Sequence, residues 1–226
     1  MKLRVGMQNV AKVVVIFFFF AAWSLIYDQV NEHSARPDRT IHLTRPVDRF
    51  PGIIQPWTAV IYVFGGIALP LLPFVYNWTW PRLRFVLTCY AVTSMLAFAC
   101  YWLWPLGIVR PIFLGNSLGE RLMRGVFTID REANCFPSGH TFFATLGGIL
   151  VWRGGASGAV SRSTWVLAVA VCATTVTTGQ HYFIDVTGGV AAALLGYTTT
   201  RMLMPPTKRV VSGRAVTVPS NASHGG

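Results

Sequence analysis

The sequence predicts an all-α, polytopic integral membrane protein with six transmembrane helices. Hydrophobic residues make up 53% of the 226 residues and charged residues only 12%, which is about half the charged share of a soluble domain. Six windows of the chain approach the roughly 20 apolar residues that a spanning helix needs. The basic residues also gather on one side of the membrane that these windows imply.

The six windows follow one another from the amino terminus to residue 204. The first comes after Lys2 and Arg4, so a cleaved signal peptide is an alternative interpretation. Trp23, however, stands where the cleavage site would need a small residue. We therefore expect this segment to stay in the chain as a helix. The predicted spans are approximately 10–27, 56–76, 85–104, 139–153, 164–180 and 183–204.

The net charge of +11 is distributed as in a membrane protein rather than a nucleic-acid-binding protein. With both termini on one side, that side receives eleven basic residues and no acidic residue, and the other side receives eight of each. Basic loops mark the cytoplasmic side, so we predict cytoplasmic termini and no nucleic-acid partner. The eleven basic residues are Lys2, Arg4, Lys12, Arg82, Arg84, Arg153, Arg162, Arg201, Lys208, Arg209 and Arg214.

Residues 1–204 are predicted to form a single membrane domain, and 205–226 have the composition of a disordered tail. Three of the four cysteines fall inside apolar windows, and Cys135 alone lies in the outer loops, so no loop disulfide is expected within the chain. The short chain and the lack of paired outer cysteines favour a bacterial inner membrane.

Polar residues collect at the ends of three windows. They are Arg110-Pro111 after the third window, 137–140 (Pro-Ser-Gly-His) at the start of the fourth, and 180–185 between the fifth and the sixth. Ionisable residues at the edge of a membrane segment are costly unless they are paired or face water, so they mark functional sites. All three stretches lie on the non-basic side of the predicted topology, which indicates one composite site at the outer membrane interface.

The first part of this site suits a phosphate group. Ser138 can cap the fourth helix and leave backbone N–H groups and the positive end of the helix dipole for an anion. Gly139 lets the anion approach the backbone closely. Arg110 offers a planar fork of donors that matches phosphate oxygens. Taken singly, an interfacial Arg and a capping residue also have purely structural interpretations.

The second part suits phosphoryl transfer through histidine. His181 and Asp185 are four residues apart and share one face if the helix begins at or before His181. An aspartate that accepts a hydrogen bond from one ring nitrogen fixes the tautomer and frees the other nitrogen as a nucleophile. His140 can donate a proton to a departing oxygen. Phosphoryl transfer needs mainly this kind of positioning and charge stabilisation.

At these residues the sequence resembles the type-2 phosphatidic acid phosphatase, or lipid phosphate phosphatase, superfamily. Its pattern is a Lys-x6-Arg-Pro element, a Pro-Ser-Gly-His element and a Ser-Arg-x5-His-x3-Asp element on a six-helix membrane core. Residues 137–140 match the second element in full, Arg110-Pro111 match the end of the first, and His181 and Asp185 match the end of the third. The resemblance covers about residues 56–204.

Two cations of the family pattern are missing. Leu103 stands in place of the lysine, and Thr174-Thr175 stand in place of the Ser-Arg pair. Another basic residue of the outer loops would have to compensate, and the candidates are Arg121, Arg124 and Arg131. With these departures, the sequence is similar to the inositolphosphotransferase-like branch of the superfamily. This branch includes inositol phosphorylceramide synthases and is related to sphingomyelin synthases.

The resemblance implies a mechanism. His181 would attack phosphorus to form a phosphohistidine, Asp185 would orient His181, and His140 would protonate the leaving group. The phosphate would be held by Arg110, Ser138 and Gly139. Water would then complete a lipid phosphatase reaction, whereas a lipid alcohol would complete a head-group transfer. The resemblance implies no cofactor and no metal, because a magnesium site usually presents several carboxylates.

Two other classes remain open at this stage. Intramembrane His and Asp residues also mark transporters and channels, although ionisable residues here lie at the window ends, with Lys12 the exception. The missing cations also leave a catalytically dead scaffold as an alternative. The identity of the lipid and the oligomeric state are not predicted.

Overall fold

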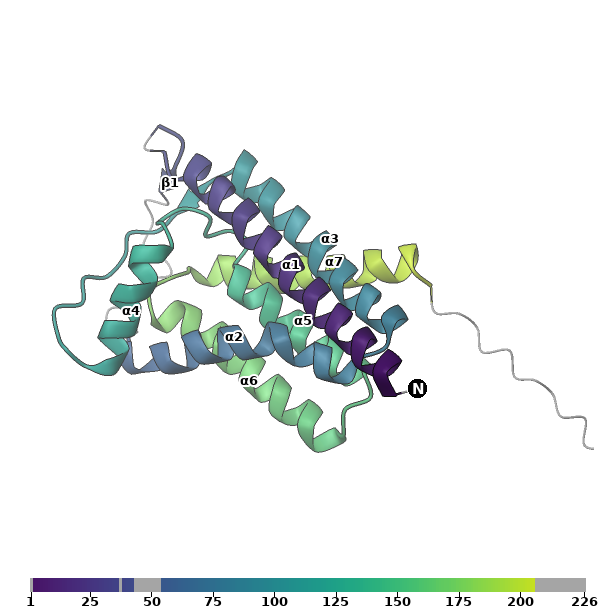
Figure 1. The fold of residues 1–226 in the computed structure, drawn as a ribbon. Helices are drawn as coiled ribbons and strands as arrows, with labels where there is room; N and C mark the ends of the chain where they lie inside the picture. The colour runs from purple at the N-terminus through teal and green to yellow at the C-terminus, as the bar shows by residue number, and fades with distance from the viewer. Residues whose placement is uncertain (1, 37, 43–53, 206–226) are drawn as a thin grey trace, which may run out of the picture.

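The computed structural model describes residues 2–36, 38–42 and 54–205. These parts of the chain form seven α-helices, one short 3-10 turn and two two-residue strands (Figure 1). The predicted tail beyond Pro205 lies outside the described residues. The elements in order are α1 (Lys2–Ser34), β1 (Ile41–His42), η2 (Pro56–Thr58), α2 (Ala59–Tyr76), α3 (Trp80–Leu103), β2 (Leu106–Gly107), α4 (Leu118–Ile129), α5 (Gly139–Arg153), α6 (Gly158–Thr177) and α7 (Phe183–Leu203).

Each of the six predicted windows coincides with a helix, and four of these helices are long and apolar enough to cross a membrane. The four segments are Gly6–Ser34, Pro56–Tyr76, Trp80–Leu103 and Gly158–Thr177. α5 has only 15 residues, about 22 Å of helix, against a hydrocarbon core of roughly 30 Å. α7 is longer, but it includes Asp185, Arg201 and a run of threonines.

α5 is the central helix of the fold. All its residues from Thr141 to Val151 are buried, as expected of a helix that is apolar on every side. It packs against α2, α6 and α7, and glycines allow the close approach. A Cβ on Gly147 would lie 2.6 Å from the carbonyl oxygen of Leu69, and one on Gly189 would lie 2.7 Å from that of Ser138. The contact at Gly189 sets the start of α7 beside the start of α5.

α1 packs along α3, and Figure 1 shows the two helices running side by side. Aromatic rings fill this contact: the Trp23 and Tyr27 rings of α1 lie 5.8 and 6.4 Å, centroid to centroid, from the Phe98 ring of α3. Polar anchors supplement them, because Trp23 Nε1 donates to Ser94 Oγ at 2.8 Å and Ser34 Oγ donates to the Tyr101 carbonyl at 2.9 Å. α1 is thereby fixed against the rest of the bundle.

α4 is a helix that the sequence analysis did not anticipate. Its first turn has a capping box, in which the Ser117 side chain accepts from the Glu120 N–H and the Glu120 carboxylate accepts from the Ser117 N–H. At the same end of the molecule, β1 pairs with β2 in parallel, with Ile41 opposite Leu106. In Figure 1, α4 and β1 lie at the end opposite the amino terminus and the last turn of α7.

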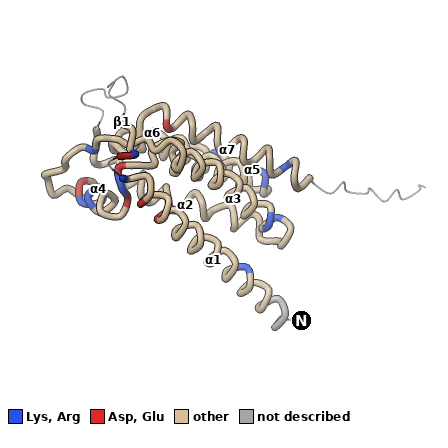
Figure 2. Tube along the Cα trace, turned by 90° about the horizontal axis from the view of Figure 1, so that it is seen from above, with Lys and Arg blue, Asp and Glu red and all other residues tan. Residues whose placement is uncertain are grey.

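Charged residues are distributed unequally between these two ends of the molecule. In Figure 2, acidic residues gather toward the end with α4, where basic residues also lie, whereas the end with the amino terminus and the last turn of α7 shows basic residues alone. This pattern matches the asymmetry predicted from the sequence. The apolar helices and the charge distribution together describe an integral membrane protein.

Candidate active site

The start of α5 is tied to two other helices. Ser138 is the N-cap residue: its hydroxyl accepts from the Thr141 N–H at 3.4 Å, and its own N–H donates to the Asp185 carbonyl at 2.9 Å. The Tyr101 hydroxyl of α3 donates to the Pro137 carbonyl at 2.6 Å. These bonds hold the amino terminus of α5 against α3 and α7.

His181 and Asp185 meet, but not in the way the helical spacing suggested. α7 begins at Phe183, so His181 lies before the helix and Asp185 lies in its first turn. The Asp185 carboxylate reaches back, accepting from the Tyr182 N–H at 2.8 Å, and the same oxygen is 3.5 Å from His181 Nδ1. Both side chains are buried, at 9% and 0% exposure.

His140 lies in the first turn of α5 and faces α2. Its Nδ1 is 3.1 Å from the Tyr62 hydroxyl, and the two rings are 4.2 Å apart, centroid to centroid. Gly66, one turn further along α2, makes room for the imidazole, since a Cβ there would lie 2.9 Å from His140 Cδ2. The His140 and His181 rings are 6.5 Å apart, which leaves a space between the two imidazoles.

Arg110 spans from the loop after β2 to the end of α4. Its guanidinium donates to the main-chain oxygens of Asp130 and Arg131, both at 2.6 Å, and lies over the Phe127 ring at 4.7 Å. It also approaches the Asp130 carboxylate and the Gln180 side-chain oxygen, each at 3.4 Å. These partners fix the cation beside the loop that carries His181.

Asp130, at the end of α4, contacts side chains of α1 and of the loop after β2. Its carboxylate accepts from the Tyr27 hydroxyl at 2.7 Å and from Asn31 Nδ2 at 3.4 Å, both on α1, and it pairs with Arg110. Burial raises the pKa of Asp130 above its ordinary value, and the Tyr27 hydrogen bond and the Arg110 cation oppose that shift. The carboxylate therefore links α1 to the cation of the site.

The predicted site residues surround one cavity of about 380 Å³. Arg110, Gly139, His140 and His181 line it directly, whereas Ser138 and Asp185 are buried behind this lining. A Cβ on Gly139 would make only ordinary contacts with the protein, so packing does not explain the glycine. The remainder of the lining is mainly apolar and includes Phe20, Trp23, Ile67, Pro70, Leu71 and Phe143.

The three arginines considered as replacements for the missing cations differ in their position relative to the cavity. Arg131 lines the cavity with Arg110, whereas Arg121 and Arg124 do not line it. Of the two positions where the family pattern has a cation, Leu103 is 80% exposed and Thr175 is buried. The Thr175 carbonyl accepts the N–H groups of both Gln180 and His181 at 3.1 Å, so this residue shapes the histidine loop.

A second cavity, of about 720 Å³, lies on the other side of Arg110 and Asp130. Both residues line both cavities, as do Arg131 and Ala133. Its other lining residues are more polar and include Thr40, His42, Arg124, Thr128 and Glu132. The Arg110–Asp130 pair therefore lies at the boundary between the first, more apolar cavity and the second, more polar one.

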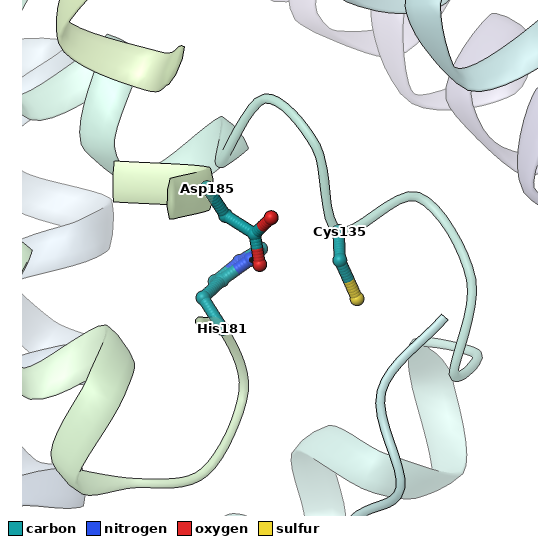
Figure 3. A group of neighbouring side chains, drawn as sticks. All are labelled: Cys135, His181 and Asp185. Carbon is teal, nitrogen blue, oxygen red and sulfur yellow. Dashed lines mark ion pairs between the residues drawn. The ribbon is translucent and has the colours of Figure 1, made fainter. Parts of the chain in front are cut away.

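Within the described residues, one group of side chains has the donor set of a metal site. Cys135, His181 and Asp185 each offer a ligand atom, and these atoms lie within 4.8 Å of one another. Figure 3 shows the Asp185 carboxylate next to the His181 ring, with Cys135 presented by the neighbouring loop. The set combines a thiol, an imidazole and a carboxylate, which is typical of zinc-type cations rather than of magnesium.

Sequence reasoning missed two residues of this site, Tyr62 and Asp130, and it gave Gln180 no role. Tyr62 and Asp130 carry no local motif, and their contacts depend on helix packing over 78 and 103 residues of sequence, to His140 and Tyr27 respectively. Gln180 directly precedes His181, and its side-chain oxygen approaches Arg110. Its position in the stretch 180–185 was the one available signal.

The comparison with protein families agrees with the resemblance seen in the sequence. The profile described as "PAP2 superfamily" matches residues 42–199. A crystal structure titled as the first transmembrane PAP2 type phosphatidylglycerolphosphate phosphatase from Bacillus subtilis aligns with a TM-score of 0.44 and 19% identity, over 88% of this chain and 98% of that one. No curated protein matches the chain. The family match covers most of the sequence, and the chain belongs to the PAP2 superfamily.

Proposed function

We propose that the protein hydrolyses a lipid phosphate or diphosphate through a phosphohistidine on His181. The observation that carries this proposal is the lining of the first cavity, which combines basic and apolar side chains. At one end are two histidines and two arginines, together with the polar side chains of Asp130, Asn134 and Gln180, and apolar side chains of α1, α2 and α5 form much of the remaining wall. A phosphate fits the first end, and a lipid chain fits the second, because burying its apolar surface is favourable.

The first chemical step uses both histidines. His181 Nδ1 faces Asp185, so the lone pair on Nε2 is the one directed to phosphorus. Attack forms an N–P bond and breaks the bond between phosphorus and the leaving oxygen. In the protonated form of His140, Nδ1–H donates to the Tyr62 hydroxyl oxygen. The Nε2 proton then passes to the leaving oxygen and leaves a neutral imidazole.

The second step reverses these roles. His140, now without its Nε2 proton, accepts a proton from water as the water oxygen attacks phosphorus. The N–P bond breaks, inorganic phosphate leaves, and His181 returns to its neutral form. Asp185 stabilises the positive charge that develops on the His181 ring in the first step.

Phosphate binding rests on the start of α5 and on the arginines. Ser138 and Gly139 begin the helix, so unpaired N–H groups and the helix dipole favour an anion there. Arg110 is a fixed cation beside the histidines, and Arg131 supplies a second one, as a substitute for those missing at Leu103 and Thr175. No step of this mechanism needs a metal.

In the membrane, we propose that α5 and α7 complete six spans with the four longer helices. The basic end of the molecule faces the cytoplasm and the histidines face the outer leaflet, following the positive-inside rule. A bacterial inner membrane fits this arrangement. The lipid then reaches the histidines sideways from the outer leaflet, along the apolar wall formed by α1 and α2.

The test is phosphate release from a panel of lipid phosphates and diphosphates by the purified protein in detergent. We expect release that His181→Ala abolishes and that His33→Ala, a change on α1 away from the cavity, leaves intact. Equal release by wild type and His181→Ala would contradict the proposal. Silence of the wild type across the panel would favour the scaffold or transporter interpretations.

The second cavity favours one further candidate, a head-group phosphotransferase. Its polar lining adjoins the histidine cavity at the Arg110–Asp130 pair, so a second reactant has a compartment of its own. The same assay with ceramide or diacylglycerol, read by mass spectrometry, distinguishes the two reactions. Transferred head group without free phosphate would identify the transferase, and free phosphate alone would identify the phosphatase.

A further inference from the structure

The histidine that carries the proposed chemistry has an unused side. His181 Nδ1 is 3.5 Å from Asp185 Oδ2, which is longer than a well-formed hydrogen bond. Neither His181 Nδ1 nor Asp185 Oδ1 has a hydrogen-bond partner among the described residues, and both atoms are buried. A buried polar atom left unpaired is destabilising, so these two atoms are suited to an additional ligand.

Cys135 brings a third donor to the same place. Its thiol is buried, and its Sγ lies 3.8 Å from the Glu132 carbonyl oxygen and 3.9 Å from that of Gln180, so it makes only weak contacts. Its main chain is held by a hydrogen bond from its N–H to the Leu106 carbonyl at 3.0 Å. The thiol is therefore presented by a fixed loop rather than by a mobile one.

We propose that Cys135, His181 and Asp185 form an inhibitory binding site for a borderline-soft divalent cation of the Zn²⁺ class. Sulfur, nitrogen and a single carboxylate oxygen match zinc-type cations, whereas Mg²⁺ and Ca²⁺ select oxygen donors. Zinc bonds of about 2.0–2.3 Å put neighbouring ligand atoms roughly 3.3–3.7 Å apart. The three donors here lie within 4.8 Å of one another, so small side-chain rotations close the site (Figure 3).

The position of this site gives it an inhibitory effect, a consequence that rests on the proposed function. A cation on His181 Nδ1 takes the place of the proton there, so the neutral ring carries its proton on Nε2, and Asp185 binds the cation instead of orienting the ring. His181 Nε2 then loses the nucleophilicity that the first step needs. Three protein ligands leave a fourth position open, as in zinc sites with an exchangeable ligand, so the cation can also hold an anion beside the arginines.

The binding itself can be tested without any enzymatic assay. Co²⁺ added to the purified, metal-free protein should give a thiolate-to-cobalt absorption band that titrates to one ion per chain, and Zn²⁺ should displace it. Cys135→Ser and Cys135→Ala should lack the band. Cys100→Ser, which alters a cysteine on α3 outside the group, should keep it. A wild type without the band, or a Cys135→Ala protein that retains it, would overturn the site.

Inhibition is the second arm of the test. Zn²⁺ should suppress wild-type phosphate release, and Cys135→Ser should raise the concentration for half-inhibition at least about tenfold, since even outer-shell changes alter metal affinity by 10–100-fold. Serine is close to cysteine in size and keeps the main-chain hydrogen bond to Leu106, so hydrolysis without metal should persist. Activation by Zn²⁺, or equal inhibition of Cys135→Ser and wild type, would contradict the inhibitory role.

The two arms separate this proposal from the proposed function. A cobalt band that depends on Cys135 in a protein that releases no phosphate would retain the metal site and reject the phosphatase. Phosphate release that depends on His181, with no band and no effect of Zn²⁺, would retain the phosphatase and reject the metal site.

Discussion

The Tyr62 hydroxyl lies 3.1 Å from Nδ1 of His140, and the tyrosine ring is tilted against the imidazole at 4.2 Å. This contact joins α2 to the first turn of α5 and leaves Nε2 as the only ring nitrogen of His140 that can act on a substrate. Tyr62 is thus a positioning residue for the proposed acid, and it lies 78 residues away from it in sequence.

Replacing Tyr62 with Phe should lower turnover about 5–10-fold, because one hydrogen bond contributes roughly 1 kcal/mol. The loss should appear in kcat rather than KM, and the alkaline limb of the pH–rate profile should shift, since His140 must be protonated to act as the acid and Tyr62 contacts its other ring nitrogen. Tyr90→Phe removes another buried hydroxyl, which donates to the Pro70 carbonyl at 3.0 Å, and is the matched control. Equal effects of the two changes would reduce Tyr62 to a packing role.

Gly66→Ala should impair catalysis by crowding His140. The new Cβ would lie 2.9 Å from His140 Cδ2, so the imidazole must move, and misplacement by about 1 Å can cost 10²-fold in rate. Gly125→Ala is the control, because a Cβ on that exposed position of α4 meets nothing within 4 Å. We expect kcat to fall in the first variant alone, with thermal unfolding within a few degrees of wild type in both. Unchanged kcat in Gly66→Ala would argue against a catalytic His140.

Asp130→Asn should weaken substrate binding more than it slows chemistry. The change removes the charge that pairs with Arg110 and that accepts from Tyr27, and hydrogen bonds to charged groups are worth about 1.5–3 kcal/mol. We expect KM for a lipid phosphate to rise about tenfold, with a smaller change in kcat. Asp28→Asn, on the exposed side of α1, should leave KM unchanged. A change confined to kcat would assign Asp130 to the chemical step instead.

Asp185→Asn tests the orientation of the proposed nucleophile. Asparagine can still accept the Tyr182 N–H bond, which is 2.8 Å in the structure, so the start of α7 should remain folded. It cannot balance positive charge on His181, and we expect kcat to fall about 10²-fold or more. The KM should change little, since Asp185 lies behind the cavity lining. Full activity in a folded Asp185→Asn protein would remove Asp185 from the mechanism.

The helices were largely predictable because apolar composition alone identifies them. The window 139–153 coincides with α5, and 183–204 with α7 to within one residue. The number of helices that cross the membrane was less predictable. α5 is short, and its apolar residues are buried inside the helix bundle. α4 was missed, although Ser117 and Glu120 form a capping box that the sequence displays. Long apolar stretches predict helices by composition alone, whereas α4 is a short amphipathic helix of 12 residues.

The histidines, Arg110 and the start of α5 were predictable as site candidates because they occur in motifs at the ends of apolar windows. The residues that hold these candidates in place were not predictable. Asp130 appears in the sequence as an ordinary loop acid, and its importance comes from α1 folding back to bring Tyr27 within 2.7 Å. The His181–Asp185 pair was predicted from helical spacing, yet it forms because the first-turn aspartate reaches back to a residue outside the helix.

The most direct test of the central claim is capture of the phosphorylated enzyme. The protein would be mixed with a lipid phosphate that it hydrolyses, quenched within milliseconds at alkaline pH to preserve an acid-labile phosphoramidate, and digested for mass spectrometry. The account predicts a phosphoryl group on the peptide that contains His181, formed fast enough to precede phosphate release and absent in His181→Asn. Steady hydrolysis with no phosphorylated His181 peptide, or with the label on another residue, would contradict it.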